Sequence, residues 1–192
     1  MDLYPVTNAQ YKEFVAATGR AVPRHWKDGA IPLSLDEHPV VWVNWADAEA
    51  FCTWAGKRLP TEYEWEKAAR GVDGRLYPWG NRLPDCDKAQ YGDCGGATVP
   101  VGSSLVGTSP YGMLDMAGNV WEWVADWYDP AFYGLSPEQN PQGPDSGERR
   151  VFRGGSWGYP PAFIRASERA RNRPTYAGFN VGFRCAAQVP TG

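Results

Sequence analysis

The pattern of apolar and polar positions along the chain predicts three short helices, all within the first 71 residues. Two of them open with a capping box, in which a threonine is followed three residues later by a glutamine or a glutamate. These pairs begin at Thr7 and Thr61, and glycines that favour a helix end follow at Gly19 and Gly71. The expected helical ranges are 7–19, 44–55 and 61–71.

The pattern changes after the third helix. Residues 72–119 contain glycine, proline, aspartate and asparagine at short intervals and keep neither a helical nor a strand period. So long an irregular stretch is either disordered or held by specific contacts, and Trp79, Tyr91 and Tyr111 favour the second alternative. Strand-like runs then follow at 120–127, 150–157 and 181–187. This order of elements predicts one α+β domain over residues 1–192.

Composition narrows the class of protein without identifying it. The 192 residues carry 19 basic and 22 acidic side chains, so the chain lacks the positive charge on which binding to nucleic acid usually depends. No apolar run approaches the roughly 20 residues of a membrane span, and no signal peptide is visible at the start. Ten tryptophans and ten tyrosines, with 22 glycines and 17 prolines, indicate a loop-rich fold held by aromatic packing.

Seven motifs, in order along nearly the whole chain, resemble those of the formylglycine-generating enzyme (sulfatase-modifying factor) family. They occupy residues 4–11, 38–45, 57–66, 77–81, 118–123, 153–157 and 182–185. The resemblance implies a variant of the C-type lectin fold with little regular secondary structure. The family includes copper oxidases that convert a sulfatase cysteine to formylglycine and one half of the iron sulfoxide synthases that make ergothioneine. It also includes ligand-binding relatives, among them variable proteins of diversity-generating retroelements, so the fold alone does not fix the function.

The positions of the cysteines argue against the oxidase. The family's oxidases bind copper(I), a soft ion, through two thiolates shortly after the Gly-Gly-Ser motif. The corresponding stretch, 156–164, contains no cysteine, so we expect no copper. Ser156 matches a serine of the family's active site, but a serine without the metal ligands is weak evidence for catalysis. The sulfoxide synthases hold iron on three histidines of a separate helical domain, and this chain has two histidines in all.

The four cysteines have structural interpretations instead. Cys86 and Cys94 flank a short loop and are suitably spaced for a local disulfide. The resemblance implies that Cys52 and Cys185 form a second disulfide. The alternative is four reduced thiols in a cytosolic protein, and the spacing does not suit a zinc site.

The resemblance also implies a calcium site. Asp115 and Glu122 are carboxylates seven residues apart with a glycine between them, and calcium takes six to eight oxygen ligands. The family's ligands map onto these two side chains and onto the carbonyls of Gly118 and Val120. The alternative is that both carboxylates accept hydrogen bonds from backbone amides. A second family site maps onto Gln90, Tyr91, Asp93 and Gly95, where a Cys86–Cys94 disulfide would serve in place of a cation.

The segment 157–180 has the composition of a binding surface. It mixes aromatic residues with glycine, serine, asparagine and arginine, which together supply contact area and adaptable hydrogen bonds. The retroelement variable proteins diversify this same stretch. We expect a protein or small-molecule ligand to contact Gly158, Tyr159, Phe163, Glu168, Ala170, Arg171, Tyr176, Ala177, Gly178 and Phe179. The alternative is that the arginines of the segment pair with surface carboxylates and that Tyr176 and Phe179 belong to the core.

These observations predict a non-catalytic ligand-binding domain whose scaffold is fixed by one calcium ion and one or two disulfides. A catalytic interpretation needs a metal or a matched acid and base, and neither is clear in the sequence. The first alternative is nevertheless an enzyme, either an oxidase of altered mechanism or half of a sulfoxide synthase. The second is a regulatory domain of a larger chain.

Overall fold

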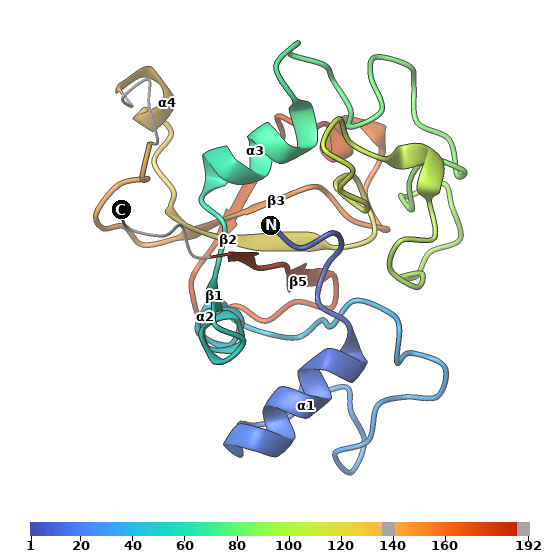
Figure 1. The fold of residues 1–192 in the computed structure, drawn as a ribbon, viewed down its shortest axis with the longest axis vertical. Helices are drawn as coiled ribbons and strands as arrows, with labels where there is room; N and C mark the ends of the chain where they lie inside the picture. Colours follow the sequence, from blue (N-terminus) through green and yellow to red (C-terminus); the bar gives the residue numbers. More distant parts are fainter. Residues whose placement is uncertain (136–140, 188–192) are drawn as a thin grey trace.

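The computed structural model describes residues 1–135 and 141–187, and it has the mixed α+β architecture expected from the sequence (Figure 1). Four α-helices are present in these ranges: α1 (Asn8–Thr18), α2 (Trp45–Trp54), α3 (Glu62–Arg70) and the single turn α4 (Phe132–Leu135). Two short 3-10 helices, Leu105–Gly107 and Pro161–Ile164, lie in the loops. Each of the first three begins with a complete capping box, including one at Asn44 that the sequence analysis did not identify. Local hydrogen bonding therefore explains why these helices start where the sequence predicts.

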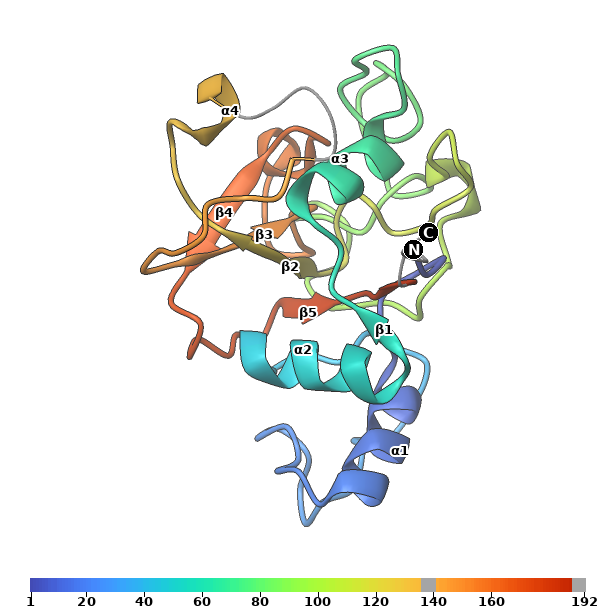
Figure 2. The ribbon, with the colours of Figure 1, turned by 60° about the vertical axis from the view of Figure 1, so that its left-hand side comes forward.

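Within the described part of the chain, four strands form the main sheet in the order β4-β3-β2-β5. They are β2 (Trp121–Trp127), β3 (Arg150–Arg153), β4 (Arg169–Asn172) and β5 (Val181–Phe183). β3 runs antiparallel to both of its neighbours, and β2 and β5 are parallel. A separate antiparallel pair joins β1 (Lys57–Arg58) to β6 (Ala186–Ala187). Two views place α3 on one side of the main sheet and α1 and α2 on the other (Figures 1 and 2).

The structure differs from the predicted strands at three places. β3 ends at Arg153 because Gly154 and Gly155 take left-handed backbone angles, with φ of 97° and 75°. The run 181–187 divides into β5 and β6, which pair with different partners. β4 was not predicted, because its sequence, Arg-Ala-Arg-Asn, contains a single apolar residue and so shows no sustained strand pattern.

The irregular segment after α3 is held by packing, as predicted from its aromatic residues. Tyr77 and Trp79 stack with their ring centres 5.2 Å apart, and Tyr77 and Tyr91 belong to a small buried cluster with Ile164. Tyr111 does not contribute to this packing, because its side chain is exposed. Across the ranges that the structure describes, none of the helices has the length and apolar character needed to cross a membrane.

Candidate functional site

The segment after β3 folds over the sheet and lines a pocket of about 320 Å³. Six of the ten residues predicted to contact a ligand line it, namely Tyr159, Phe163, Glu168, Ala170, Arg171 and Tyr176. Six further lining residues were not predicted to contact a ligand: Trp121, Phe152, Arg169, Asn172, Asn180 and Val181. We call the space enclosed by these twelve residues the aromatic pocket.

The other four predicted residues lie outside the aromatic pocket. The ring of Phe179 is 49% exposed and lies beside Trp42 and Trp157, at centroid distances of 6.1 and 5.6 Å. The carbonyl of Gly178 accepts a hydrogen bond from the Trp42 amide at 2.8 Å. Gly158 is exposed and Ala177 is half-buried. The alternative that Phe179 belongs to the core is therefore wrong, whereas Tyr176 is half-buried and packs against the core.

Aromatic rings form one wall of the pocket. Trp121 packs edge to face against Phe152 and Tyr159, with ring centres 5.3 and 5.6 Å apart, and Tyr159 contacts Phe163 in the same manner at 5.5 Å. This geometry is the favourable one for ring pairs, so the rings stabilise one another in place. Trp121 and Phe152 come from adjacent strands, and a sequence cannot show that pairing without knowledge of the strand register.

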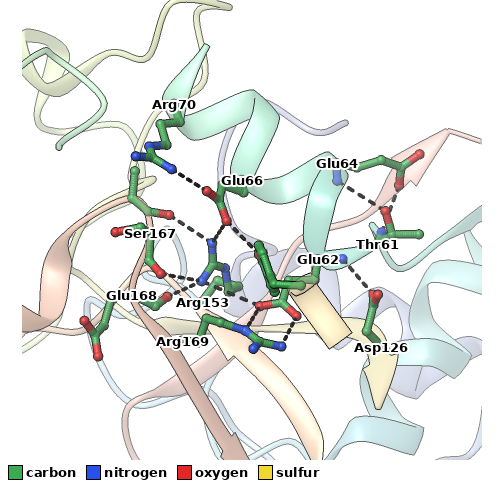
Figure 3. A network of polar contacts seen from close by, with 12 residues as sticks. Thr61, Glu62, Glu64, Glu66, Arg70, Asp126, Arg153, Ser167, Glu168 and Arg169 are labelled. Carbon is green, nitrogen blue, oxygen red and sulfur yellow. Dashed lines mark hydrogen bonds and ion pairs between the residues drawn. The ribbon is translucent and has the colours of Figure 1, made fainter. Parts of the chain in front are cut away.

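A buried ionic network fixes strand β4, which contributes to the pocket lining (Figure 3). Arg169 binds the carboxylate of Glu62 through two hydrogen bonds, of 2.6 and 2.8 Å, and Glu62 is only 2% exposed. Arg153, which is fully buried, binds Glu66 at 2.6 Å and donates to the backbone carbonyls of Ser167 and Glu168 at 3.1 and 2.5 Å. β4 and the turn before it are thus fixed to α3, which positions the pocket residues of β4.

The network continues to the first turn of α3. The carboxylate of Asp126 accepts hydrogen bonds from the backbone amides of Glu62, at 2.7 Å, and Gly143, at 3.1 Å. Burial raises the pKa of Asp126 to about 6, and the neighbouring Glu62 carboxylate acts in the same direction. A titrating group therefore accepts a hydrogen bond from the backbone of Glu62, the residue whose side chain anchors Arg169.

A loop closed by a disulfide is hydrogen-bonded to the backbone of Tyr159. The structure joins Cys86 to Cys94 and Cys52 to Cys185, so all four cysteines of the sequence are in disulfides. Within the small loop, the amide of Gly92 donates to the carbonyl of Tyr159 at 2.8 Å. The loop therefore restrains the backbone of a residue that lines the aromatic pocket.

The serine of the family motif is buried beneath the pocket. Ser156 has no exposed surface, and its hydroxyl oxygen accepts a hydrogen bond from the Asn180 side chain at 3.0 Å. Asn180 lines the pocket, so it connects the motif serine to the pocket surface. No cysteine is present in 156–164 to supply a thiolate, and the residues at this place do not fit copper(I).

The residues predicted to bind calcium have protein partners in this structure. Both oxygens of Glu122 bind the guanidinium of Arg184 at 2.7 Å, and one of them also accepts from the indole nitrogen of Trp65. Asp115 accepts from the Gly102 amide at 2.6 Å, and burial raises its pKa. Asp115 therefore suits a cation better than Glu122 does, because a cation would compete with Arg184 for Glu122. Calcium at this loop stays a prediction.

The second predicted cation loop is held by other contacts. The side chain of Gln90 donates to the carbonyl of Ala97 at 2.6 Å, and Tyr91 is part of the buried cluster around Tyr77. Asp93 and Gly95 flank Cys94 of the disulfide. Within residues 1–135 and 141–187, no group of three or more histidine, cysteine, aspartate or glutamate side chains is arranged to hold a metal ion.

Comparison with known proteins places the chain in a family. A model of the sulfatase-modifying factor enzyme 1-like domain matches residues 1–189. The chain is 35% identical to the formylglycine-generating enzyme of Mus musculus, over all of this chain and 66% of the enzyme. It is 42% identical to the inactive C-alpha-formylglycine-generating enzyme 2 of the same organism, over 98% of this chain and 75% of that protein. The chain thus spans just under two thirds of the mouse enzyme.

A solved structure supports the fold and the resemblance to variable proteins. Treponema denticola variable protein 1 superposes with a TM-score of 0.76 at 27% identity, covering 93% of this chain and 80% of that one. The C-type lectin-like α+β fold predicted from the motifs is confirmed by this match. With the family model matching nearly the entire length, this chain belongs to the formylglycine-generating enzyme (sulfatase-modifying factor) family.

Proposed function

We propose that this chain is a ligand-binding member of the family and that its ligand occupies the aromatic pocket. The observation that carries the proposal is the convergence of six residues, chosen from sequence as ligand contacts, around one pocket. The walls of this pocket are held by ring packing, by a buried ionic network and by a disulfide-closed loop. Such fixed walls favour binding, because a preformed site loses little conformational freedom when a ligand enters.

The cysteine chemistry of the family's oxidases has no counterpart in this chain. Its four cysteines are all in disulfides, and none belongs to the stretch that carries the copper thiolates in the oxidases. The mouse relative that is 42% identical is named as an inactive enzyme, so loss of activity has a precedent in the family. Both points support a non-catalytic function.

The test is a screen of small fragments against the intact chain by two-dimensional NMR. We expect hits to shift the signals of Trp121, Tyr159 and Tyr176. Ala170→Leu narrows the pocket and should abolish these shifts, whereas Ala177→Leu, a matched change at a half-buried alanine outside the lining, should retain them. Hits whose NMR shifts are unchanged in Ala170→Leu, or the absence of any hit, would contradict the proposal.

A direct assay separates this function from the oxidase. The chain is incubated with copper(I), oxygen and a cysteine-containing peptide, and the peptide is examined by mass spectrometry. We expect the cysteine to survive unchanged, because no pair of thiolates is available to hold the metal. Conversion of the cysteine to an aldehyde would overturn the non-catalytic assignment and favour the enzyme.

A narrower form of the proposal is that the pocket segment is diversified, as in the retroelement variable proteins. The observation that supports it is the structural match to Treponema denticola variable protein 1. Sequencing the DNA around the gene tests it. A nearby reverse transcriptase with a near-copy of the segment coding for residues 157–184, differing mainly at adenines, is the expected result. Their absence leaves a binding domain of fixed specificity.

We also propose calcium at the loop 115–120, with Asp115 as its carboxylate ligand. Asp115 is buried and has one amide donor, and its φ of 56° turns the backbone sharply at this point. Added calcium should raise the melting temperature by several degrees above that in a chelator, since a ligand of the native state stabilises it. Asp115→Asn should remove the increase, whereas Asp93→Asn, in the other loop, should retain it. Equal melting temperatures with calcium and chelator would exclude the site.

A further inference from the structure

We propose that the free edge of β4 binds an extended segment of a partner protein as an added strand, in which apolar and acidic residues alternate. The segment places an apolar side chain in the aromatic pocket and an acidic side chain beside Arg171, on the opposite face of the sheet. This inference rests on the proposed function, because it uses the same pocket. It goes further by naming the class of ligand and the way in which the backbone of the ligand is held.

The two edges of the main sheet differ in what covers them. At the β5 edge, the amide of Val6 donates a hydrogen bond to the carbonyl of Phe183 at 2.9 Å. At the other edge, β4 pairs with β3, and no other described segment forms a backbone hydrogen bond with residues 169–172 (Figure 2). No residue of β4 is buried, whereas all three residues of β5 are. The backbone donors and acceptors on the outer side of β4 are therefore open to a further strand.

Strand pairing places successive residues of β4 on opposite faces of the sheet. Ala170 pairs with Phe152 and packs against the core cluster to which Phe152 belongs. Arg171 pairs with Val151, and its guanidinium lies 4.2 Å from the centre of the Tyr128 ring, on the side of α3. A strand added to β4 has the same alternation, so its successive side chains lie beside the aromatic pocket and beside Arg171 in turn.

The aromatic pocket extends to the backbone of β4. Its lining includes five consecutive residues, 168–172. Because side chains alternate between faces along a strand, a cavity on one face contacts all five only where it reaches the main chain between them. Its volume of about 320 Å³ is near the lower limit for ligand pockets and accommodates one large side chain. Since the rings of the lining favour edge-on contacts with a further ring, phenylalanine is a suitable side chain for this position.

The charges at the β4 edge favour an acidic segment. Arg169 is neutralised by Glu62. Arg171 and Arg173 are exposed, and neither has an acidic partner among the residues that the structure describes. A guanidinium that rests on a ring keeps its in-plane donors available for a carboxylate. The same two charges disfavour pairing with β4 of a second copy, because arginines of the two copies would then lie close together.

Three short peptides test the inference by two-dimensional NMR titration of the intact chain. The acidic peptide is acetyl-Val-Glu-Phe-Glu-Val-amide, in which apolar and acidic residues alternate. The basic peptide has lysine in place of both glutamates, and the rearranged peptide, acetyl-Val-Phe-Glu-Glu-Val-amide, keeps the composition without the alternation. At low salt we expect the acidic peptide to bind at least about tenfold more tightly than either of the others. Its advantage over the basic peptide should decrease as salt is added.

Backbone methylation tests whether the acidic peptide is held as a strand. In an added strand, alternate residues direct their N–H groups toward β4, and the residues between them direct theirs toward solvent. The two matched probes carry a single N-methyl group, one on the phenylalanine and the other on the glutamate that follows it. One of these probes should bind roughly tenfold more weakly than the parent, because it loses a hydrogen bond to β4, and the other should bind about as tightly as the parent.

Two protein variants assign the acidic preference to Arg171. Arg171→Gln should weaken binding of the acidic peptide by about three- to fivefold, the range for an exposed ion pair. It should leave unchanged the affinity for a peptide that has glutamine in place of both glutamates. Arg82→Gln removes the same charge from the exposed loop after α3 and should change neither affinity. Equal effects of the two substitutions would contradict the assignment to Arg171.

The outcomes separate this inference from the proposed function. Equal affinities for the acidic, basic and rearranged peptides, or equal effects of the two N-methyl groups, would overturn strand addition while the pocket remained a binding site. If no peptide binds although the fragment screen finds ligands in the pocket, the inference fails and the proposed function stands. If the screen finds no ligand either, both fail. A dimer that the acidic peptide dissociates, detected by analytical ultracentrifugation, would assign the β4 edge to a second copy and also overturn the inference.

Discussion

Among the residues that the structure describes, four charged side chains, Glu62, Glu122, Arg153 and Arg184, are at most 2% exposed, and each has an oppositely charged partner. A pair of this kind contributes little net stability over a well-packed apolar pair, but removing one partner leaves an uncompensated charge in the interior. Glu62 is the most consequential of the four for the pocket, because it holds Arg169 and lies 3.6 Å from Arg153. The sequence alternative that Arg169 pairs with a surface carboxylate is wrong, since Glu62 is buried.

Replacing Glu62 tests this dependence. Glu62→Gln should lower the free energy of unfolding by about 3–5 kcal/mol, because Arg169 loses its counter-charge and Arg153 loses one of its two. Glu64→Gln is the matched control two residues along the same helix. Glu64 is 39% exposed, and its pair with Arg58 is worth less than about 1 kcal/mol. Urea unfolding of both variants measures the difference, and equal losses would contradict the assignment.

At the scale of elements, the sequence predicts the helices and strands whose positions depend on neighbouring residues. The three long helices follow from capping side chains and glycines that lie within a few residues of each helix end. The strand β4 could not be predicted in this way. Its only apolar residue is Ala170, and its position is fixed by Glu62, more than a hundred residues earlier. The candidate site divides in the same way. The contacts on 157–180 could be suspected from composition, whereas Trp121 and Phe152 join them only through strand pairing.

The free energy of unfolding should depend on pH through Asp126 of β2, whose carboxylate accepts a hydrogen bond from the first residue of α3. The folded chain holds the proton of Asp126 up to a pKa of about 6, while the ordinary value is 3.8. Between these values the folded state binds one proton more than the unfolded state, so stability falls as pH rises through this window. The contribution of this group is up to about 3 kcal/mol, since each pKa unit corresponds to roughly 1.4 kcal/mol.

Asp126→Asn isolates that contribution. The variant cannot ionise, so the free energy of unfolding of the wild type, minus that of the variant, should decrease from pH 4 to pH 6. It should then be constant above about pH 7, where the carboxyl is ionised in both states. Urea unfolding at pH 4, 5, 6 and 7 gives the difference directly. Parallel profiles across this range would show that Asp126 does not titrate in the folded chain as expected.

At the scale of the whole molecule, the two disulfides restrain the chain over very different lengths. Cys52–Cys185 joins α2 to the short link between β5 and β6 across 133 positions, and Cys86–Cys94 closes a loop across 8. The loop-closure model predicts a loss of about 5 kcal/mol when the first is removed and about 2–3 kcal/mol when the second is removed. Stability and binding should therefore depend on different disulfides, because the small loop is hydrogen-bonded directly to a residue that lines the aromatic pocket, through Gly92 and Tyr159.

Two double variants separate these effects. Cys86→Ala with Cys94→Ala should stay folded at 25 °C and bind pocket ligands several-fold more weakly, because the carbonyl of Tyr159 loses a fixed donor. Cys52→Ala with Cys185→Ala should lower the urea midpoint much further, while the fraction that remains folded should keep its affinity. Binding is measured with a hit from the fragment screen at a urea concentration where both variants are folded. Weaker binding in the second variant with unchanged binding in the first would mean that long-range closure of the chain, and not the small loop, shapes the aromatic pocket.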